Sequence, residues 1–155
     1  RVEIQAHPWD FCEENNETVD IVKSFRSDNV KYVYSVPHTF FYDKGVGDVA
    51  SMLRYAGSDL SHVLIADTRN HTKHCRYIVN PPGVDAVVHQ HVGVGEGDVD
   101  FDALFRTLRE MKFAEQTFKV GGEPIVATSL FGYPEKMKYQ AVETRELIER
   151  ELLRR

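Results

Sequence analysis

The sequence has few of the features that mark specialised protein classes. Only two of its 155 residues are cysteines, which argues against a disulfide-stabilised secreted domain and favours a reduced, cytoplasmic protein. It has no apolar run near the roughly 20 residues of a membrane span, so we expect no membrane partner. Lysine and arginine number 19 against 24 acidic residues, so we expect no nucleic-acid partner either.

What remains is the composition of an ordinary globular domain. Apolar residues make up 42% of the chain and charged residues 28%, which is enough for a real core. The length fits a single domain covering residues 1–155. Because the sequence opens at Arg1, in a segment that already resembles a strand, we expect a fragment of a longer protein.

Strand-like and helix-like segments alternate along the chain. Strands are predicted at 2–7, 30–34, 62–66 and 124–130, and helices at about 16–26, 49–56, 101–111 and from 134 onward. This alternation indicates an α/β fold with a parallel sheet. Four βα units match half of a (β/α)8 TIM barrel, and an open doubly wound parallel sheet is the alternative.

The segment 87–111 joins two histidines, a glycine-rich turn and the start of a helix. Gly93, Gly95 and Gly97 allow backbone conformations that other residues avoid, and Asp100 is expected to cap the helix. The spacing is neither a dinucleotide fingerprint nor a phosphate-binding P-loop. A plain connecting turn is the alternative to a functional loop.

Polar side chains gather just after the predicted strands, where barrel enzymes carry their active sites. Most are histidines, which serve as general bases near neutral pH or as metal ligands. Taken singly, each could also be an ordinary surface residue. His62 is excluded because it opens its strand and belongs at the opposite edge. The candidates are His7, Asp10, Ser35, His38, Asp67, Asn70, His71, His74, His89, His91 and Ser129.

Several segments resemble the C-terminal half of sugar-phosphate isomerase/epimerase barrels of the xylose isomerase-like family. They are EIQAHPWDF, SVPH, SHVLIADT and VGVGEGDVDFDALFRTLREMKF. RYIVNPPG, VHQHVGVGEG and TSLFGYPEKM are similar to members that act in bacterial myo-inositol catabolism. The resemblance implies a sugar or cyclitol (phosphate) isomerase or epimerase. A non-catalytic ligand-binding or regulatory module is one alternative, and a barrel endonuclease, disfavoured by the acidic composition, is another.

The resemblance also implies a divalent metal held by Glu, Asp, His and Glu at the ends of four strands. In this sequence those positions carry Gln5, Ser35, Leu64 and Ser129. None is a carboxylate or an imidazole, so the standard metal site is not supported and the cofactor stays open. If a metal binds, we expect imidazole ligands from His71, His74, His89 and His91.

Matching the family motifs residue by residue assigns roles to the candidates. The predicted catalytic residues are His38, Asp67 and His7, and a carboxylate near His38 is expected to raise its pKa. The predicted substrate-binding residues are Asn70, His89, His91, Glu96 and Trp9. The expected partners are a small-molecule sugar or inositol derivative, and a second copy or a missing N-terminal half that covers the free sheet edges.

Overall fold

The computed structural model describes residues 1–42, 47–70 and 89–153. Four strands form one sheet in the order β1-β2-β3-β4, and every neighbouring pair is parallel. The strands are β1 (Val2–Gln5), β2 (Val30–Ser35), β3 (Leu60–Ile65) and β4 (Ile125–Thr128). All four predicted strands are therefore confirmed, with shorter bounds at β1 and β4.

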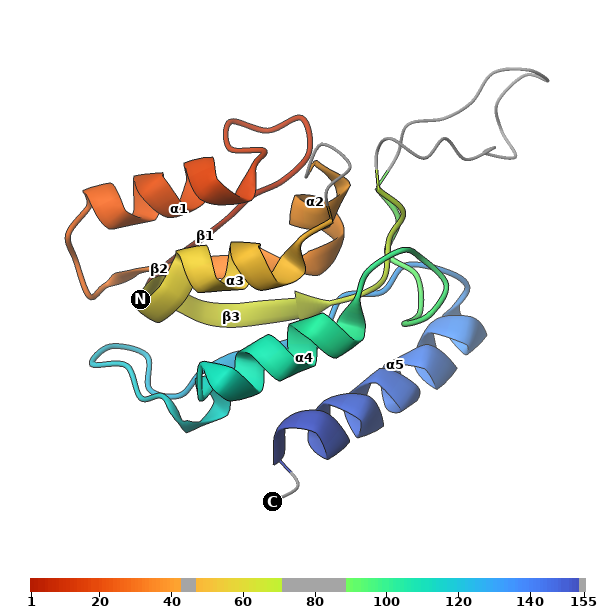
Figure 1. The fold of residues 1–155 in the computed structure, drawn as a ribbon. Helices are drawn as coiled ribbons and strands as arrows, with labels where there is room; N and C mark the ends of the chain where they lie inside the picture. The colour runs from red at the N-terminus through yellow and green to blue at the C-terminus, as the bar shows by residue number, and fades with distance from the viewer. Residues whose placement is uncertain (43–46, 71–88, 154–155) are drawn as a thin grey trace.

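Helices follow the strands and pack beside one another (Figure 1). Their bounds are α1 (Asn15–Ser24), α2 (Val36–Phe41), α3 (Val49–Ala56), α4 (Phe101–Glu110) and α5 (Pro134–Ile148). Helix α3 packs between α1 and α4. Short 3-10 turns at Gly57–Asp59 and Phe113–Glu115 and a π turn at Glu149–Leu153 complete the set.

The strand order decides between the two predicted architectures. A doubly wound sheet reverses its strand order at a switch point, so that helices cover both faces. In this sheet the strands lie side by side in the order in which they follow one another in the chain. Because βαβ crossovers are right-handed, the connecting helices then all lie on the same face of the sheet. The chain is an α/β fold with four parallel strands in one sheet, as in part of a TIM barrel, and the doubly wound alternative is wrong.

The core lies between the sheet and the helices. Tyr32 and Tyr34 of β2 and Val63 and Ile65 of β3 are fully buried, and Leu104 of α4 packs in the same cluster. His62 and Leu64, which alternate with buried residues of β3, are only half-buried. One face of the sheet is therefore covered by helices, and the other face is less deeply buried. Within the described residues, no helix is long and apolar enough to cross a membrane.

Helix α1 begins differently from the sequence prediction. The sequence predicts Asn15 or Asn16 as the N-cap of this helix, but the N-cap is Glu14, whose side chain makes no capping hydrogen bond. Asn15 instead lies inside the helix and is 6% exposed. Its Oδ1 accepts the Tyr32 hydroxyl at 2.9 Å and its Nδ2 donates to the Met52 carbonyl at 3.3 Å. The amide is therefore used to join α1, β2 and α3.

Helix α2 occupies a stretch that the sequence predicts as loop. Pro37 lies in its first turn, where the missing N–H costs nothing, and Phe40 and Phe41 are buried. Six residues are too few for helical periodicity to stand out, so tertiary packing decides the conformation. The consequence is that His38 is carried by a helix.

The other helix boundaries agree with prediction. Asp48 caps α3 by accepting the Ser51 N–H at 2.9 Å, and Asp100 caps α4 by accepting the Ala103 N–H at 2.8 Å. Gly57, with φ +56°, ends α3.

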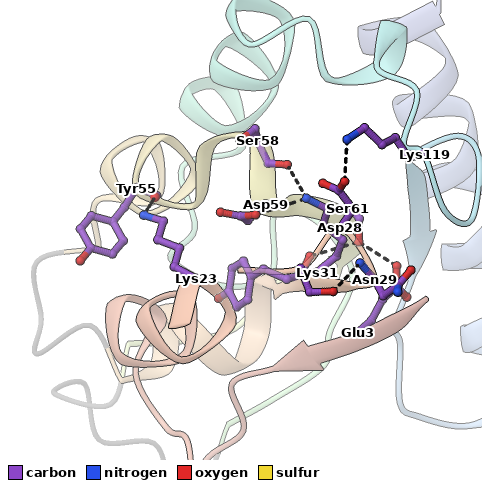
Figure 2. Close-up of polar contacts among 12 residues, drawn as sticks. Glu3, Lys23, Asp28, Asn29, Lys31, Tyr55, Ser58, Asp59, Ser61 and Lys119 are labelled. Carbon is purple, nitrogen blue, oxygen red and sulfur yellow. Dashed lines mark hydrogen bonds and ion pairs between the residues drawn. The ribbon is translucent and has the colours of Figure 1, made fainter. Parts of the chain in front are cut away.

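Polar contacts join the amino ends of the strands (Figure 2). Lys31 Nζ lies 3.2 Å from Asp59 Oδ1, and the Ser61 hydroxyl donates to Glu3 Oε1 at 2.7 Å. Burial raises the pKa of Glu3, but the hydrogen bonds from Ser61 and His62 and the Arg1 guanidinium together lower it more. His62 Nδ1 lies 3.5 Å from the other Glu3 oxygen, which confirms that His62 belongs to this edge.

Candidate functional site

Four histidines meet at the opposite, carboxyl edge of the sheet. His7 follows β1, His38 lies on α2 after β2, and His89 and His91 come after β3 in the chain. The ring centroids of His38 lie 4.5 Å from His7, 5.0 Å from His89 and 5.0 Å from His91, and those of His89 and His91 are 5.3 Å apart. We refer to these four residues as the histidine cluster.

Main-chain carbonyls orient three of the four rings. His7 Nδ1 lies 2.8 Å from the Pro8 oxygen, His38 Nδ1 3.1 Å from the Ala6 oxygen, and His91 Nδ1 2.7 Å from the Ser129 oxygen. A carbonyl oxygen only accepts, so each Nδ1 carries the hydrogen. In a neutral ring the Nε2 atom is then left with a lone pair.

Two of these lone pairs face each other. The Nε2 atoms of His38 and His91 are 3.1 Å apart, and both residues are buried. His89 adds a further nitrogen, because its Nδ1 is buried without a hydrogen-bond partner in the part of the chain that the structure describes. The cluster therefore offers several unprotonated nitrogens in a small volume.

Burial keeps these rings neutral. Burial, with the neighbouring histidines adding to it, lowers the pKa of His38 to about 3 and that of His89 to about 4. Burial also lowers the pKa of His91. The expectation that a carboxylate raises the pKa of His38 is wrong, because the groups around it are other histidines.

His7 is partly open to solvent. Its side chain is 39% exposed, and its Nδ1 lies 3.6 Å from the Asp10 carboxylate, which is itself 74% exposed. It therefore joins the buried rings to solvent.

Aromatic rings border the cluster. Trp9, 59% exposed and with φ +64°, has its ring 5.6 Å from His89 and 6.0 Å from Phe41. Phe131 stacks on His91 at 4.2 Å and is 69% exposed. The sequence reasoning missed Phe131, although its position just after β4 could have indicated it.

Asp67 contacts the glycine-rich turn at 93–97 and does not belong to the histidine cluster. Its Oδ2 accepts the N–H groups of Gly95 and Gly97, each at 2.8 Å. Its Oδ1 accepts those of Thr68 at 2.8 Å and Val99 at 3.2 Å. Asp67 and His38 both lie within the described residues, and no hydrogen bond joins them. These contacts give Asp67 a structural role in holding the turn, and they do not support the predicted catalytic role.

Two predicted substrate-binding residues also lie in other contacts. Glu96 accepts a hydrogen bond from Gln140 at 2.8 Å and forms an ion pair with Lys136 at 3.0 Å, which connects the glycine turn to α5. Asn70 is 4% exposed and donates to the Phe40 carbonyl of α2 at 3.4 Å. His71 and His74, the other suggested ligands, lie outside the described residues.

The family's metal-ligand positions do not fit a metal in this structure. Gln5 is exposed at the end of β1, and Leu64 of β3 has no ligating atom. Ser35 is fully buried and Ser129 is half-buried, and both offer a neutral hydroxyl. These four positions therefore offer no carboxylate or imidazole to a divalent metal ion.

Sequential parallel strands, with site-bearing side chains after the strand ends, define part of a (β/α)8 barrel protein. The chain belongs to the xylose isomerase-like TIM barrel family, whose sequence model matches residues 1–124. A comparison with curated protein sequences finds no match.

Solved structures of similar fold include an AP endonuclease of family 2 from Brucella melitensis, with 18% identity and a TM-score of 0.58. A D-allulose 3-epimerase from Methylomonas sp. has 15% identity and a TM-score of 0.62. The IOLI protein with a binding zinc atom has 24% identity and a TM-score of 0.56. The alignments cover 94%, 98% and 96% of this chain and 45%, 49% and 45% of those chains. The chain thus spans about half their length, and the likeness establishes the fold.

Proposed function

We propose that this chain forms part of an isomerase or epimerase acting on a sugar or cyclitol, with the histidine cluster facing the substrate. The observation that carries the proposal is the gathering of four imidazoles at the carboxyl edge of the strands. In barrel enzymes the reaction takes place at that edge. Solved structures of similar fold include an L-ribulose 3-epimerase and a D-allulose 3-epimerase, which supports this reaction type.

Resemblance to the H protein of bacterial myo-inositol catabolism supports a cyclitol-derived substrate. The segments that carry it are RYIVNPPG, VHQHVGVGEG and TSLFGYPEKM. The partner proposed here is therefore a small polyhydroxylated molecule, without nucleic acid or membrane.

The chemistry requires a proton to leave a carbon next to a carbonyl and to return. His7 is the preferred proton-transfer group, because its partly exposed ring lies beside Asp10 and can exchange protons with solvent. His38 and His91 present lone pairs, which suit hydrogen bonds donated by substrate hydroxyl groups. The Trp9 ring offers an apolar surface for a sugar ring.

A non-catalytic binding module is the second candidate. The low pKa of His38 favours it, because a buried ring that stays neutral is a weak base at neutral pH. This candidate requires the same substrate contacts without proton transfer.

Exchange of the substrate α-hydrogen in deuterated solvent distinguishes the two. The full-length protein is incubated with keto-sugars and keto-cyclitols, and NMR follows deuterium incorporation. For the enzyme we expect exchange that His7→Gln lowers by about 10²-fold or more with the fold retained. His62→Gln, at the opposite edge, is the matched control and should leave exchange unchanged. Saturable binding without exchange would overturn the enzymatic proposal in favour of the binding module.

We also propose how the chain assembles and where it is located. The edges of the four-stranded sheet, β1 and β4, suit pairing with a second copy or with the rest of a barrel. A cytoplasmic location is supported by Cys12, a buried free thiol.

A further inference from the structure

A second polar cluster lies at the amino edge of the sheet, opposite the histidine cluster. Arg1 Nη2 lies 3.0 Å from Glu3 Oε1, and His62 Nδ1 lies 3.5 Å from Glu3 Oε2. The Ser61 hydroxyl donates to the same carboxylate at 2.7 Å (Figure 2). One carboxylate therefore serves a guanidinium, an imidazole and a hydroxyl group.

Two nitrogen atoms of this amino-edge cluster lack a hydrogen-bond partner. Arg1 Nη1 and His62 Nε2 are both buried, and neither has a partner within the part of the chain that the structure describes. The Arg1 side chain is only 7% exposed, so its charged N–H groups are largely withdrawn from solvent. Buried polar atoms in folded proteins nearly always have a partner. These two atoms therefore mark a contact that a further group completes.

The unpartnered atoms belong to the face of the sheet that the helices leave uncovered. Ile4 of β1 and Val63 of β3 pack in the core beside the helices. Glu3 and His62 directly precede them along the strands, and successive side chains of a strand point to opposite faces. In a closed barrel that opposite face is the barrel interior.

The turn before β4 holds the Arg1 guanidinium in place. The Arg1 Cζ atom lies 5.3 Å from the centre of the Phe118 ring, within the range of a cation–π contact. A Cβ atom at Gly121 would lie 2.8 Å from the same Cζ atom, so the guanidinium packs directly against the backbone there. The unpartnered Nη1 is therefore part of a built site and not the end of a loose side chain.

A carboxylate is the group that best completes this contact. Guanidinium groups pair with carboxylates through charge-assisted hydrogen bonds, which are about twice as strong as neutral ones. Glu3 pairs with Nη2 and leaves Nη1 free, and Asp59 is paired with Lys31 at 3.2 Å. An added carboxylate brings one negative charge. A second hydrogen on the His62 ring balances that charge, and its Nε2–H then donates to the carboxylate.

The layered interior of a barrel indicates where the carboxylate comes from. Side chains fill a (β/α)8 barrel in layers of four, contributed by alternate strands. Glu3 on β1 and His62 on β3 come from alternate strands and lie 3.5 Å apart, so they belong to one layer. The other two members of the layer come from the strands that complete the barrel.

We propose that an Asp or Glu on a strand outside residues 1–155 completes this layer and binds Arg1 Nη1 and His62 Nε2. The inner face of the sheet at its amino edge is then a docking surface for an acidic strand. The inference goes beyond the proposed function, because it concerns the edge of the sheet opposite the histidine cluster.

An experimental structure of the full-length protein tests the proposal directly. We expect a carboxylate oxygen within about 3.2 Å of Arg1 Nη1, on a residue near the amino end of one of the completing strands. A water molecule, a neutral side chain or a residue of a second protein copy at that place would overturn the proposal.

Unfolding of full-length variants in urea measures the same contact. Arg1→Met should raise the equilibrium constant for unfolding by about 100-fold or more, because removing one partner of a buried ion pair leaves the other charge uncompensated. Changing the partner acid to its amide should have a similar effect, and the double variant should fall short of the product of the two effects by about tenfold or more. The matched control is Lys119→Met, which breaks a pair with Asp28 whose side chains are 82% and 56% exposed, and it should change the constant by less than about fivefold.

Independent effects of Arg1→Met and the amide variant, whose product equals that of the double variant, would overturn the contact. If Arg1→Met fails to fold, the structure of the unaltered full-length protein decides the matter. These measurements need no substrate. Absence of α-hydrogen exchange would therefore overturn the proposed enzymatic function and leave this inference untouched.

Discussion

The carboxylate of Asp67 accepts the backbone N–H of Gly97 at 2.8 Å, although 30 positions of sequence separate the two residues. A Cβ atom at Gly97 would overlap that carboxylate and the Thr68 carbonyl. The backbone of the glycine-rich turn therefore surrounds the Asp67 carboxylate, to which the N–H groups of Gly95 and Gly97 donate their hydrogen bonds. This explains the glycine at position 97 without a bound phosphate.

Replacing this carboxylate should destabilise the protein. Asp67→Asn removes the negative charge and turns one acceptor into a donor that faces backbone N–H groups. Hydrogen bonds to charged groups contribute about 1.5–3 kcal/mol each, so we expect a loss of about 3 kcal/mol or more in the free energy of unfolding, measured in urea. Asp102→Asn, an exposed change in the first turn of α4, should cost less than about 1 kcal/mol. Unaltered stability of Asp67→Asn would contradict the structural role.

The hydroxyl of Tyr32 is expected to contribute to stability through Asn15. Tyr32→Phe leaves the buried Asn15 Oδ1 without its 2.9 Å donor, which should cost about 1–3 kcal/mol in thermal or urea unfolding. Tyr55→Phe removes a hydroxyl that bonds Asp20 at 2.7 Å on the exposed surface, and should change stability by no more than about 0.5 kcal/mol. Equal effects of the two substitutions would show that the buried network adds nothing.

The protein should lose stability on mild acidification. The folded pKa values of His38 and His89 are about 3 and about 4, below the ordinary value of 6.5. As pH falls below about 6.5 the unfolded chain takes up protons that the folded chain does not, so unfolding becomes easier. The contribution is complete above about pH 6.5 and is lost progressively toward about pH 3. Burial lowers the pKa of His91 as well, so this ring adds to the same response. His7 faces the same rings.

Unfolding followed between pH 7 and pH 5 checks this prediction. The midpoint for the unaltered protein should fall more steeply than that of His38→Gln, which removes one of the two rings. If the unfolding midpoints of the two proteins fall in parallel with pH, the predicted contribution of His38 is wrong.

Much of the fold could be predicted because local rules and tertiary structure agree. The apolar run 63–66 marks most of β3, and the side chain of Asp100 caps α4 as predicted. The prediction failed at α2, where packing of Phe40 and Phe41 outweighs a weak local signal.

The candidate site was predictable only in part. Position after a strand was sufficient to bring His7, His38, His89 and His91 together, because parallel strands end at one edge. It was insufficient for Asp67 and Glu96, which also follow the third strand but have contacts within the glycine turn and with α5. Sequence position predicts that a residue lies at the carboxyl edge of the sheet, whereas the direction of its side chain depends on tertiary contacts.

The rings of His38 and His91 are oriented by the peptide oxygens of Ala6 and Ser129. Peptide oxygens are present whatever side chain a position carries. The Ser129 hydroxyl also lies 3.1 Å from His91 Nδ1, but the peptide oxygen is closer, at 2.7 Å. Substitutions at positions 6 and 129 that preserve the backbone should therefore leave both tautomers in place. The orientation of the cluster is thus encoded in strand register and helix placement, and relatives could retain it while sharing neither residue. A search for this arrangement in other barrels should therefore compare the spacing of main-chain atoms around paired imidazoles, since residue identity at the supporting positions carries no record of it.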